Sequence, residues 1–203
     1  MIQGKADTLL DEKGELESGQ IAERLYQQYP IHCLYASPYQ RAQQTASYIA
    51  RRYQLEIQTD PDLVEVDFGD FSNIRFDELK ETHPDLFQRF QSFMLSHPDQ
   101  GFVRPELPNG ESIRDIEARI TRLTNRLLDK HHGQSIALVT HGAFLKCLVA
   151  FHTGLPLTRR MPFWFENASL SIIDFYQGLP VIRSLNDTGH LGEAIRYFSP
   201  RLL

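Results

Sequence analysis

Apolar residues along this chain recur with a helical period in some segments and with a strand-like period in others. Residues 12–29 carry apolar side chains at loosely helical spacing, which predicts an amphipathic helix: Leu16, Ile21, Leu25 and Tyr29. The same reasoning predicts further helices over residues 37–53, 112–131 and 142–154, with helical patches at 75–94. Helices therefore account for much of the chain, and the segments between them decide the fold class.

Short apolar runs lie between these helices. They predict strands over residues 31–36, 54–59 and 135–140, and the continuous apolar character of 135–140 predicts a buried strand. Residues 168–176 and 180–186 alternate in polarity around a Gln-Gly turn, which predicts a β-hairpin. Interleaved strands and helices favour one domain over residues 1–203, an α/β fold with three α/β/α layers. Its sheet is expected to be mostly parallel, with antiparallel strands at the C-terminal end.

Composition and charge narrow the function classes. The 203 residues carry a net charge of -5, which gives no basis for a nucleic-acid or anionic-membrane partner. Any anion site must therefore be a local concentration of positive charge. No apolar stretch reaches the roughly 18 residues of a membrane span, and no basic-then-apolar segment resembles a signal peptide. Cys33 and Cys147 lie in apolar contexts without zinc-ligand spacing. We expect a cytoplasmic protein with reduced thiols and no metal site.

The junction "YASPYQRAQQT" places chemistry at a helix start. Ser37 and Gln40 fit a capping box, and Pro38 fits the first helical turn. Arg41 would then lie beside the positive end of the helix dipole, which is unfavourable unless an anion offsets it. Two interpretations of this junction stay open. Arg41 could bind a phosphate, or it could be an exposed arginine that points into solvent.

Two other stretches offer titratable groups. In "ALVTHGAFLK", His141 follows a strand and Gly142 lets the chain turn into a helix, at the edge where open α/β sheets bind ligands. In "DPDLVEVDFGDF", Glu65 and Asp67 have the spacing of an extended segment, so either could be a general acid. A structural histidine and a solvated acidic loop are the competing interpretations. Farther along, Ser112 and Asp115 fit a capping box that is sufficient as structure alone.

The order of these motifs resembles the histidine phosphatase superfamily, the phosphoglycerate mutase-like proteins. The resemblance rests on "SPYQRAQQTA", then L-x-E-x-D-F-G, then "GES" and "THG" before an apolar helix, and it extends through "ENASLSIIDF" and "LNDTGHL". It covers roughly residues 1–192. It implies phosphoryl transfer from a small-molecule phosphate ester to a histidine, followed by hydrolysis, without metal or cofactor.

The resemblance also assigns roles to residues. It implies that Arg41 binds phosphate, that His141 is the second active-site histidine and that Glu65 donates a proton to the leaving alcohol. Gly142 would allow close backbone approach, and Gln3 with Gly4 would border the phosphate pocket.

This chain departs from the family pattern in several places. Ser72, Asn73 and Ala143 replace the family's usual residues, and the turn around Asn73 is expected to survive because Asn tolerates the left-handed conformation. The larger departure is at the front. The family's nucleophile lies in an Arg-His-Gly triplet that ends a first, central strand, and residues 1–203 contain no such triplet. A shortened sequence of an active enzyme and a chain that has lost its nucleophile are the two explanations.

Several questions stay open at this level. The activity could be that of a phosphatase, a mutase-type phosphotransferase or a non-catalytic phosphoester-binding relative, and the shorter length favours phosphatase. The connection from Ser96 to Asn109 is expected to overhang the pocket, with Phe102 and Arg104 as candidate substrate contacts. The particular substrate and the oligomeric state cannot be read from the sequence.

Overall fold

The predicted elements form in the expected order in a computed structural model, which describes residues 4–72, 74, 76–85, 87–88, 109–159 and 163–194. Gln3, Asn73, Phe102 and Arg104 lie outside the described residues. The α-helices are α1 (Glu12–Gln28), α2 (Gln40–Tyr53), α3 (Phe76–Thr82), α5 (Ile113–Lys130) and α6 (Gly142–His152). The strands are β1 (Cys33–Ala36), β2 (Ile57–Thr59), β3 (Ile136–Val139), β4 (Leu170–Tyr176) and β5 (Leu179–Asp187). Short 3-10 turns occupy Pro61–Leu63, Gly69–Phe71, Leu157–Arg159 and Gly189–Ala194.

Two groups of strands form the middle layer. β1 pairs in parallel with β2 on one side and with β3 on the other, giving the order β2-β1-β3. β4 and β5 form an antiparallel hairpin. Gln177 and Gly178 turn that hairpin, both with positive φ, as a two-residue turn of this kind requires. The prediction of a parallel sheet followed by a C-terminal antiparallel hairpin is confirmed.

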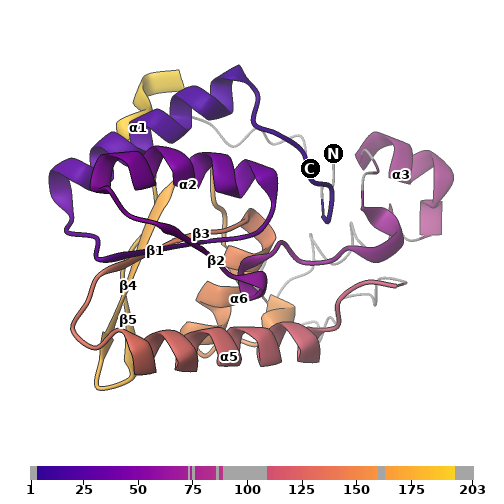
Figure 1. Cartoon of the computed structure of the whole chain (residues 1–203). Helices are drawn as coiled ribbons and strands as arrows, with labels where there is room; N and C mark the ends of the chain where they lie inside the picture. Colours follow the sequence, from indigo (N-terminus) through magenta and orange to yellow (C-terminus); the bar gives the residue numbers. More distant parts are fainter. Residues whose placement is uncertain are drawn as a thin grey trace.

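Helices cover both faces of β1 (Figure 1). Leu34 and Ala36 point toward α1 and α2 and join one apolar cluster with Ile21 and Ile49. Tyr35 points the other way and joins a second cluster with residues of α5 and α6. Because successive strand residues face opposite sides, four residues of β1 anchor both helical layers. The three-layer α/β/α prediction is confirmed.

Three details of the helices and strands differ from prediction. Leu16 is exposed because the buried stripe of α1 runs through Ile21, Ala22 and Leu25 instead. The predicted Ser37–Gln40 capping box is absent. α2 begins at Gln40, with Pro38 outside it, and the carboxylate of Asp7 accepts the Gln40 backbone N–H at 2.6 Å.

The third difference concerns β3, whose residues are all only partly buried. Its outer edge pairs with no described strand, and the strand lies against a cavity.

By contrast, the capping box of Ser112 and Asp115 at the start of α5 is confirmed. In the part of the chain that the structure describes, no helix has the length and apolar character needed to cross a membrane.

Candidate active site

The carboxyl ends of β1 and β3 bring two distant residues together. Ser37 follows β1 and His141 follows β3, and Ser37 Oγ lies 2.7 Å from His141 Nε2. The Ser37 backbone N–H also donates to the carbonyl of Val139 at 3.0 Å, which fixes the register of the two strand ends. Parallel strands end at the same edge of a sheet, so residues 104 positions apart meet here. Ser37 therefore orients the imidazole instead of capping α2.

His141 is buried and its imidazole is neutral at physiological pH. Desolvation, followed by the charges of Arg41 and Arg119, lowers its pKa to about 3. The tilted ring of Tyr39 packs against it with centroids 5.3 Å apart. A neutral imidazole keeps one nitrogen as an acceptor and one as a donor. Its N–H can therefore donate one hydrogen bond to an anionic oxygen.

Arg41 lies in the first turn of α2, as predicted. Its Nη1 donates to the carbonyl of Ala6 at 2.5 Å, and its Nη2 lies 3.4 Å from the carbonyl of Gly4. The guanidinium also packs over Tyr39, 5.0 Å from the ring centroid. Among the described residues, no carboxylate lies within salt-bridge distance of it. Backbone carbonyls thus orient the guanidinium, but no carboxylate among the described residues neutralises its charge.

Glu65 is held against the start of α6. Its carboxylate oxygens accept the backbone N–H groups of Ala143 at 3.1 Å and Phe144 at 2.8 Å, and that of Val66 at 2.8 Å. Burial raises the pKa of Glu65, although these three hydrogen bonds and the charge of Arg41 act in the opposite direction. The net effect is a pKa above the ordinary value of a glutamate carboxyl, with desolvation as the main cause.

The N-termini of α2 and α6 are therefore occupied by the protein's own carboxylates. Asp7 accepts from the first residue of α2, and Glu65 accepts from the second and third residues of α6. From the sequence, a phosphate clamp at the start of the helix that carries Arg41 was one of two open interpretations. In the described geometry these helix starts have carboxylate partners, which leaves the side chains of Arg41 and His141 as the candidates for binding an anion.

The two glycines predicted to border the site have different constraints. Gly4 has a φ of +48°, and a Cβ there would lie 2.4 Å from Ser72 Oγ. Both the positive φ and the short distance to Ser72 therefore favour glycine at position 4. Gly142 does not have a positive φ, and a Cβ there would contact no protein atom within 4 Å. The space beside Gly142 is open to a ligand.

Sequence reasoning missed Arg119, which contacts the segment just before Glu65 and the first turn of α6. Its side chain is buried and forms a bidentate ion pair with Glu111, with N–O distances of 2.9 and 2.7 Å. Nη1 donates to the carbonyls of Asp62 at 3.0 Å and Val64 at 2.7 Å.

The guanidinium of Arg119 also packs over the Phe144 ring, 4.2 Å from its centroid. Arg119 thus contacts both the segment before Glu65 and α6, the helix whose backbone N–H groups bind the Glu65 carboxylate. The available signal was a charged residue on the apolar face of the 112–131 helix, between Ile116 and Leu123. Asp67, the alternative acid, is instead paired with Lys5 at 2.6 Å.

Other histidines lie elsewhere. His32 and His131 precede β1 and β3, at the opposite edge of the sheet. His190 lies near the end of the last described segment, and its Nε2 is 2.9 Å from the carbonyl oxygen of Ala168. Within the described ranges, no group of His, Cys, Asp and Glu side chains could hold a metal ion. Cys33 and Cys147 form no disulfide bond.

Comparison with known proteins gives the family of this α/β chain. Residues 1–188 match the histidine phosphatase superfamily (branch 1), so the chain belongs to that family. It is 28% identical over 191 residues to phosphoserine phosphatase 1 of Hydrogenobacter thermophilus, covering 94% of this chain and 86% of that protein. It is 31% identical over 196 residues to a probable phosphoglycerate mutase, GpmB, of Cronobacter sakazakii, with the same two coverages.

Solved structures agree with this assignment. A phosphoserine phosphatase mutant from Entamoeba histolytica in complex with phosphoserine has a TM-score of 0.76 at 26% identity, over 94% of this chain and 90% of that chain. YhfR of Bacillus stearothermophilus has a TM-score of 0.78 at 28% identity, over 93% and 90%. The resemblance inferred from the sequence motifs is confirmed at the level of family and fold.

Proposed function

We propose that this protein hydrolyses small-molecule phosphate monoesters through a phosphohistidine intermediate. The observation that carries the proposal is the combination at one sheet edge of three groups. These are the Arg41 guanidinium without a carboxylate partner among the described residues, the neutral His141 imidazole, and the buried Glu65 carboxyl. Together they offer a cation, a neutral donor and a proton source to a dianionic phosphoryl group.

Each group has a distinct role in this proposal. A histidine nitrogen attacks phosphorus as the ester P–O bond breaks, and the leaving alkoxide takes the proton of Glu65. Water then attacks phosphorus, Glu65 takes a proton from that water, and the P–N bond breaks to release inorganic phosphate. Arg41 and His141 bind the phosphoryl oxygens throughout, and Ser37 orients the His141 ring.

The attacking histidine is the family's Arg-His-Gly histidine, which residues 1–203 do not contain. We therefore expect turnover only when a segment ending in that triplet precedes Met1. The test compares p-nitrophenyl phosphate hydrolysis by three purified proteins: residues 1–203, the same protein with a strand and Arg-His-Gly added in front, and a control carrying Arg-Asn-Gly. Turnover by the second protein alone supports the proposal. Turnover by the first or the third protein at the rate of the second contradicts the assignment of the nucleophile.

A second candidate is a non-catalytic phosphoester-binding protein, which is favoured by the presence of Arg41 and His141 without the triplet. It predicts that inorganic phosphate binds residues 1–203 in a calorimetric titration. It also predicts that the extended protein, once shown to be folded by circular dichroism, does not hydrolyse p-nitrophenyl phosphate. Mutase-type transfer is a third candidate, and transfer of phosphate to an added alcohol in place of water would identify it.

A further inference from the structure

The hydroxyl of Ser37 has two hydrogen-bonding neighbours among the described residues. Its oxygen lies 3.3 Å from the backbone nitrogen of Tyr39 and 2.7 Å from Nε2 of His141. The Tyr39 N–H can only donate, so it occupies a lone pair of the Ser37 oxygen. Ser37 is fully buried, with 0% of its surface exposed. Its hydroxyl hydrogen therefore has one acceptor in reach in the described part of the chain, which is Nε2 of His141.

This contact decides where the single proton of the neutral His141 ring lies. Desolvation by burial, followed by the charges of Arg41 and Arg119, lowers the pKa of His141 to about 3, so the ring carries one N–H at neutral pH. If Nε2 accepts the Ser37 hydrogen, that proton lies on Nδ1, because the hydrogen bond of one ring nitrogen sets the state of the other. The opposite tautomer would point an N–H at the Ser37 oxygen and leave the buried Ser37 hydrogen unsatisfied, which is unfavourable.

The other ring nitrogen, Nδ1, is the one available to a ligand. Within the described residues it has no hydrogen-bond partner, and it is not among the buried side-chain atoms that lack one, so solvent reaches it.

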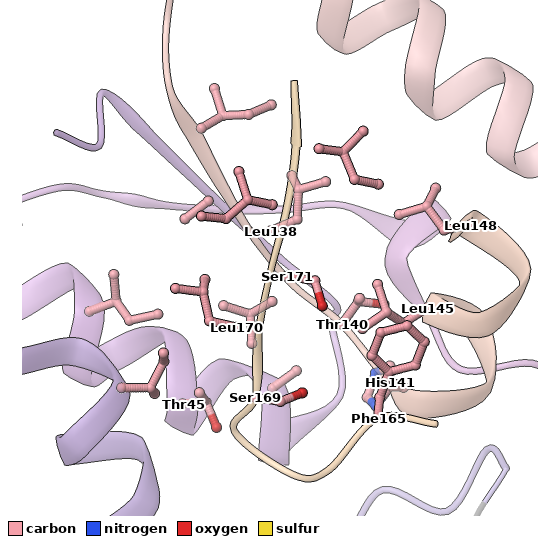
Figure 2. Close-up of a pocket in the computed structure, with 18 of the residues that line it drawn as sticks. Thr45, Leu138, Thr140, His141, Leu145, Leu148, Phe165, Ser169, Leu170 and Ser171 are labelled. Atoms are coloured by element: carbon pink, nitrogen blue, oxygen red, sulfur yellow. The ribbon is translucent and has the colours of Figure 1, made fainter. Parts of the chain in front are cut away.

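The surroundings of His141 place this nitrogen near the Arg41 guanidinium. His141 and Arg41 line the same cavity of about 1700 Å³ between β3 and β4, and Figure 2 shows His141 there with Phe165. The Tyr39 ring contacts both groups, with its centroid 5.0 Å from Arg41 Cζ and 5.3 Å from the His141 ring centroid. An anion held by Arg41 beside His141 would meet an N–H in one tautomer and a repulsive lone pair in the other.

We propose that Ser37 is a positioning residue that holds His141 in the Nδ1–H tautomer, so that Nδ1 donates a hydrogen bond to a phosphoryl oxygen bound by Arg41. The role of Nδ1 as that donor rests on the proposed function, whereas the tautomer of the ligand-free protein does not. In this tautomer the Ser37 hydrogen occupies the lone pair of Nε2, and Nδ1 carries the proton. Neither nitrogen can then attack phosphorus, so His141 binds the phosphoryl group and is not itself the nucleophile.

Nitrogen NMR reports the tautomer directly and does not depend on catalysis. Residues 1–203 are labelled with ¹⁵N-histidine, and His141→Gln identifies the His141 signals by their loss. We expect the unsubstituted protein at neutral pH to carry its His141 proton on Nδ1 alone. Ser37→Ala should populate both tautomers, and Ser37→Cys, which keeps a weak donor, should restore part of the Nδ1–H form.

Calorimetric titration with inorganic phosphate connects the tautomer to binding. If only the Nδ1–H form binds, the affinity falls in proportion to its population, so equal populations in Ser37→Ala would weaken binding about twofold. The NMR populations thus predict the loss of affinity for each variant. The matched control is Ser112→Ala, which removes the capping hydroxyl of α5 and should change neither the tautomer nor the affinity.

Three results would overturn this proposal. One is a proton on Nε2 in the unsubstituted protein, and another is an unchanged tautomer in folded Ser37→Ala. The third is weaker phosphate binding by Ser37→Ala without a change of tautomer, because Ser37 would then act only through the local structure. If Ser37→Ala does not fold, the spectra of the unsubstituted protein and of Ser37→Cys decide. A protein with the Nδ1–H tautomer that binds no phosphate would contradict the proposed phosphate site and leave the tautomer assignment standing.

Discussion

Replacing Arg119 by methionine tests whether the buried Arg119–Glu111 ion pair stabilises the protein and the segment that carries Glu65. The substitution keeps much of the apolar stem but removes the bidentate contact to Glu111 and both hydrogen bonds to the carbonyls of Asp62 and Val64. The side chains of Arg119 and Glu111 are only 6% and 16% exposed. The carboxylate of Glu111 would therefore be left without its partner in a poorly solvated place.

The expected cost follows from this burial. Breaking a buried ion pair by removing one partner costs about 3–5 kcal/mol, against about 0–1 kcal/mol for an exposed pair. Total stability is about 5–15 kcal/mol, so Arg119→Met should remove a large share of it. Adding Glu111→Gln removes the unpaired charge, and we expect the double variant to recover part of the loss.

Urea unfolding followed by circular dichroism measures both effects, provided that the slope m is unchanged. Glu111→Gln alone completes the double-mutant cycle, with an expected coupling of about 1–3 kcal/mol. A loss below about 1 kcal/mol for Arg119→Met, with additive single effects, would refute the view that this pair anchors the Glu65 segment. It would place the pair among solvent-screened surface contacts instead.

Three further predictions concern the proposed site. Arg41→Ala should weaken binding of inorganic phosphate about 10- to 150-fold in calorimetry, because a charge-assisted hydrogen bond contributes about 1.5–3 kcal/mol; Arg41→Lys should recover only part, and equal affinities would remove Arg41 from the site. The His141 pKa of about 3 lies below its unfolded value, so the unfolded state binds the extra proton and stability falls as the pH drops below about 6.5. From pH 7 to 5 this loss is about 2 kcal/mol, and His141→Gln should flatten that part of the urea-derived pH profile; an unchanged slope would contradict it. In the extended protein, Glu65→Gln should slow the first step, measured as the single-turnover release of alcohol, about 10²–10⁴-fold for an alkyl phosphate but far less for p-nitrophenyl phosphate, because p-nitrophenolate leaves without a proton; equal losses in that step would exclude Glu65 as the proton donor.

The sequence was sufficient for the elements and for several local contacts. Periodicity located the five described strands to within a few residues, since apolar alternation and apolar runs are local properties. The Gln177-Gly178 turn and the Ser112–Asp115 capping box were also predictable, because each depends on residues at most three positions apart. The motif order was specific enough to indicate the family, which the comparisons confirmed.

Local reasoning was wrong where a distant residue competes for the same group. Ser37 has the chemistry of a helix cap, but its hydroxyl lies against His141, and Asp7 accepts the helix N–H instead. A capping box is a valid local solution, and only the folded arrangement decides whether a better partner arrives from elsewhere. Arg119 was missed for the same reason, because its partners Asp62 and Val64 are remote in sequence.

The sequence by itself determined the order of helices and strands, the family and the residue types at the strand ends, because those depend on composition and short-range spacing. Only the tertiary structure decided that Arg41 lacks a carboxylate partner among the described residues, that burial raises the pKa of Glu65 and lowers that of His141, and that β3 and β4 face a common cavity. Charge, desolvation and strand pairing depend on distances between segments far apart in the chain. Those distances exist only once the layers have packed.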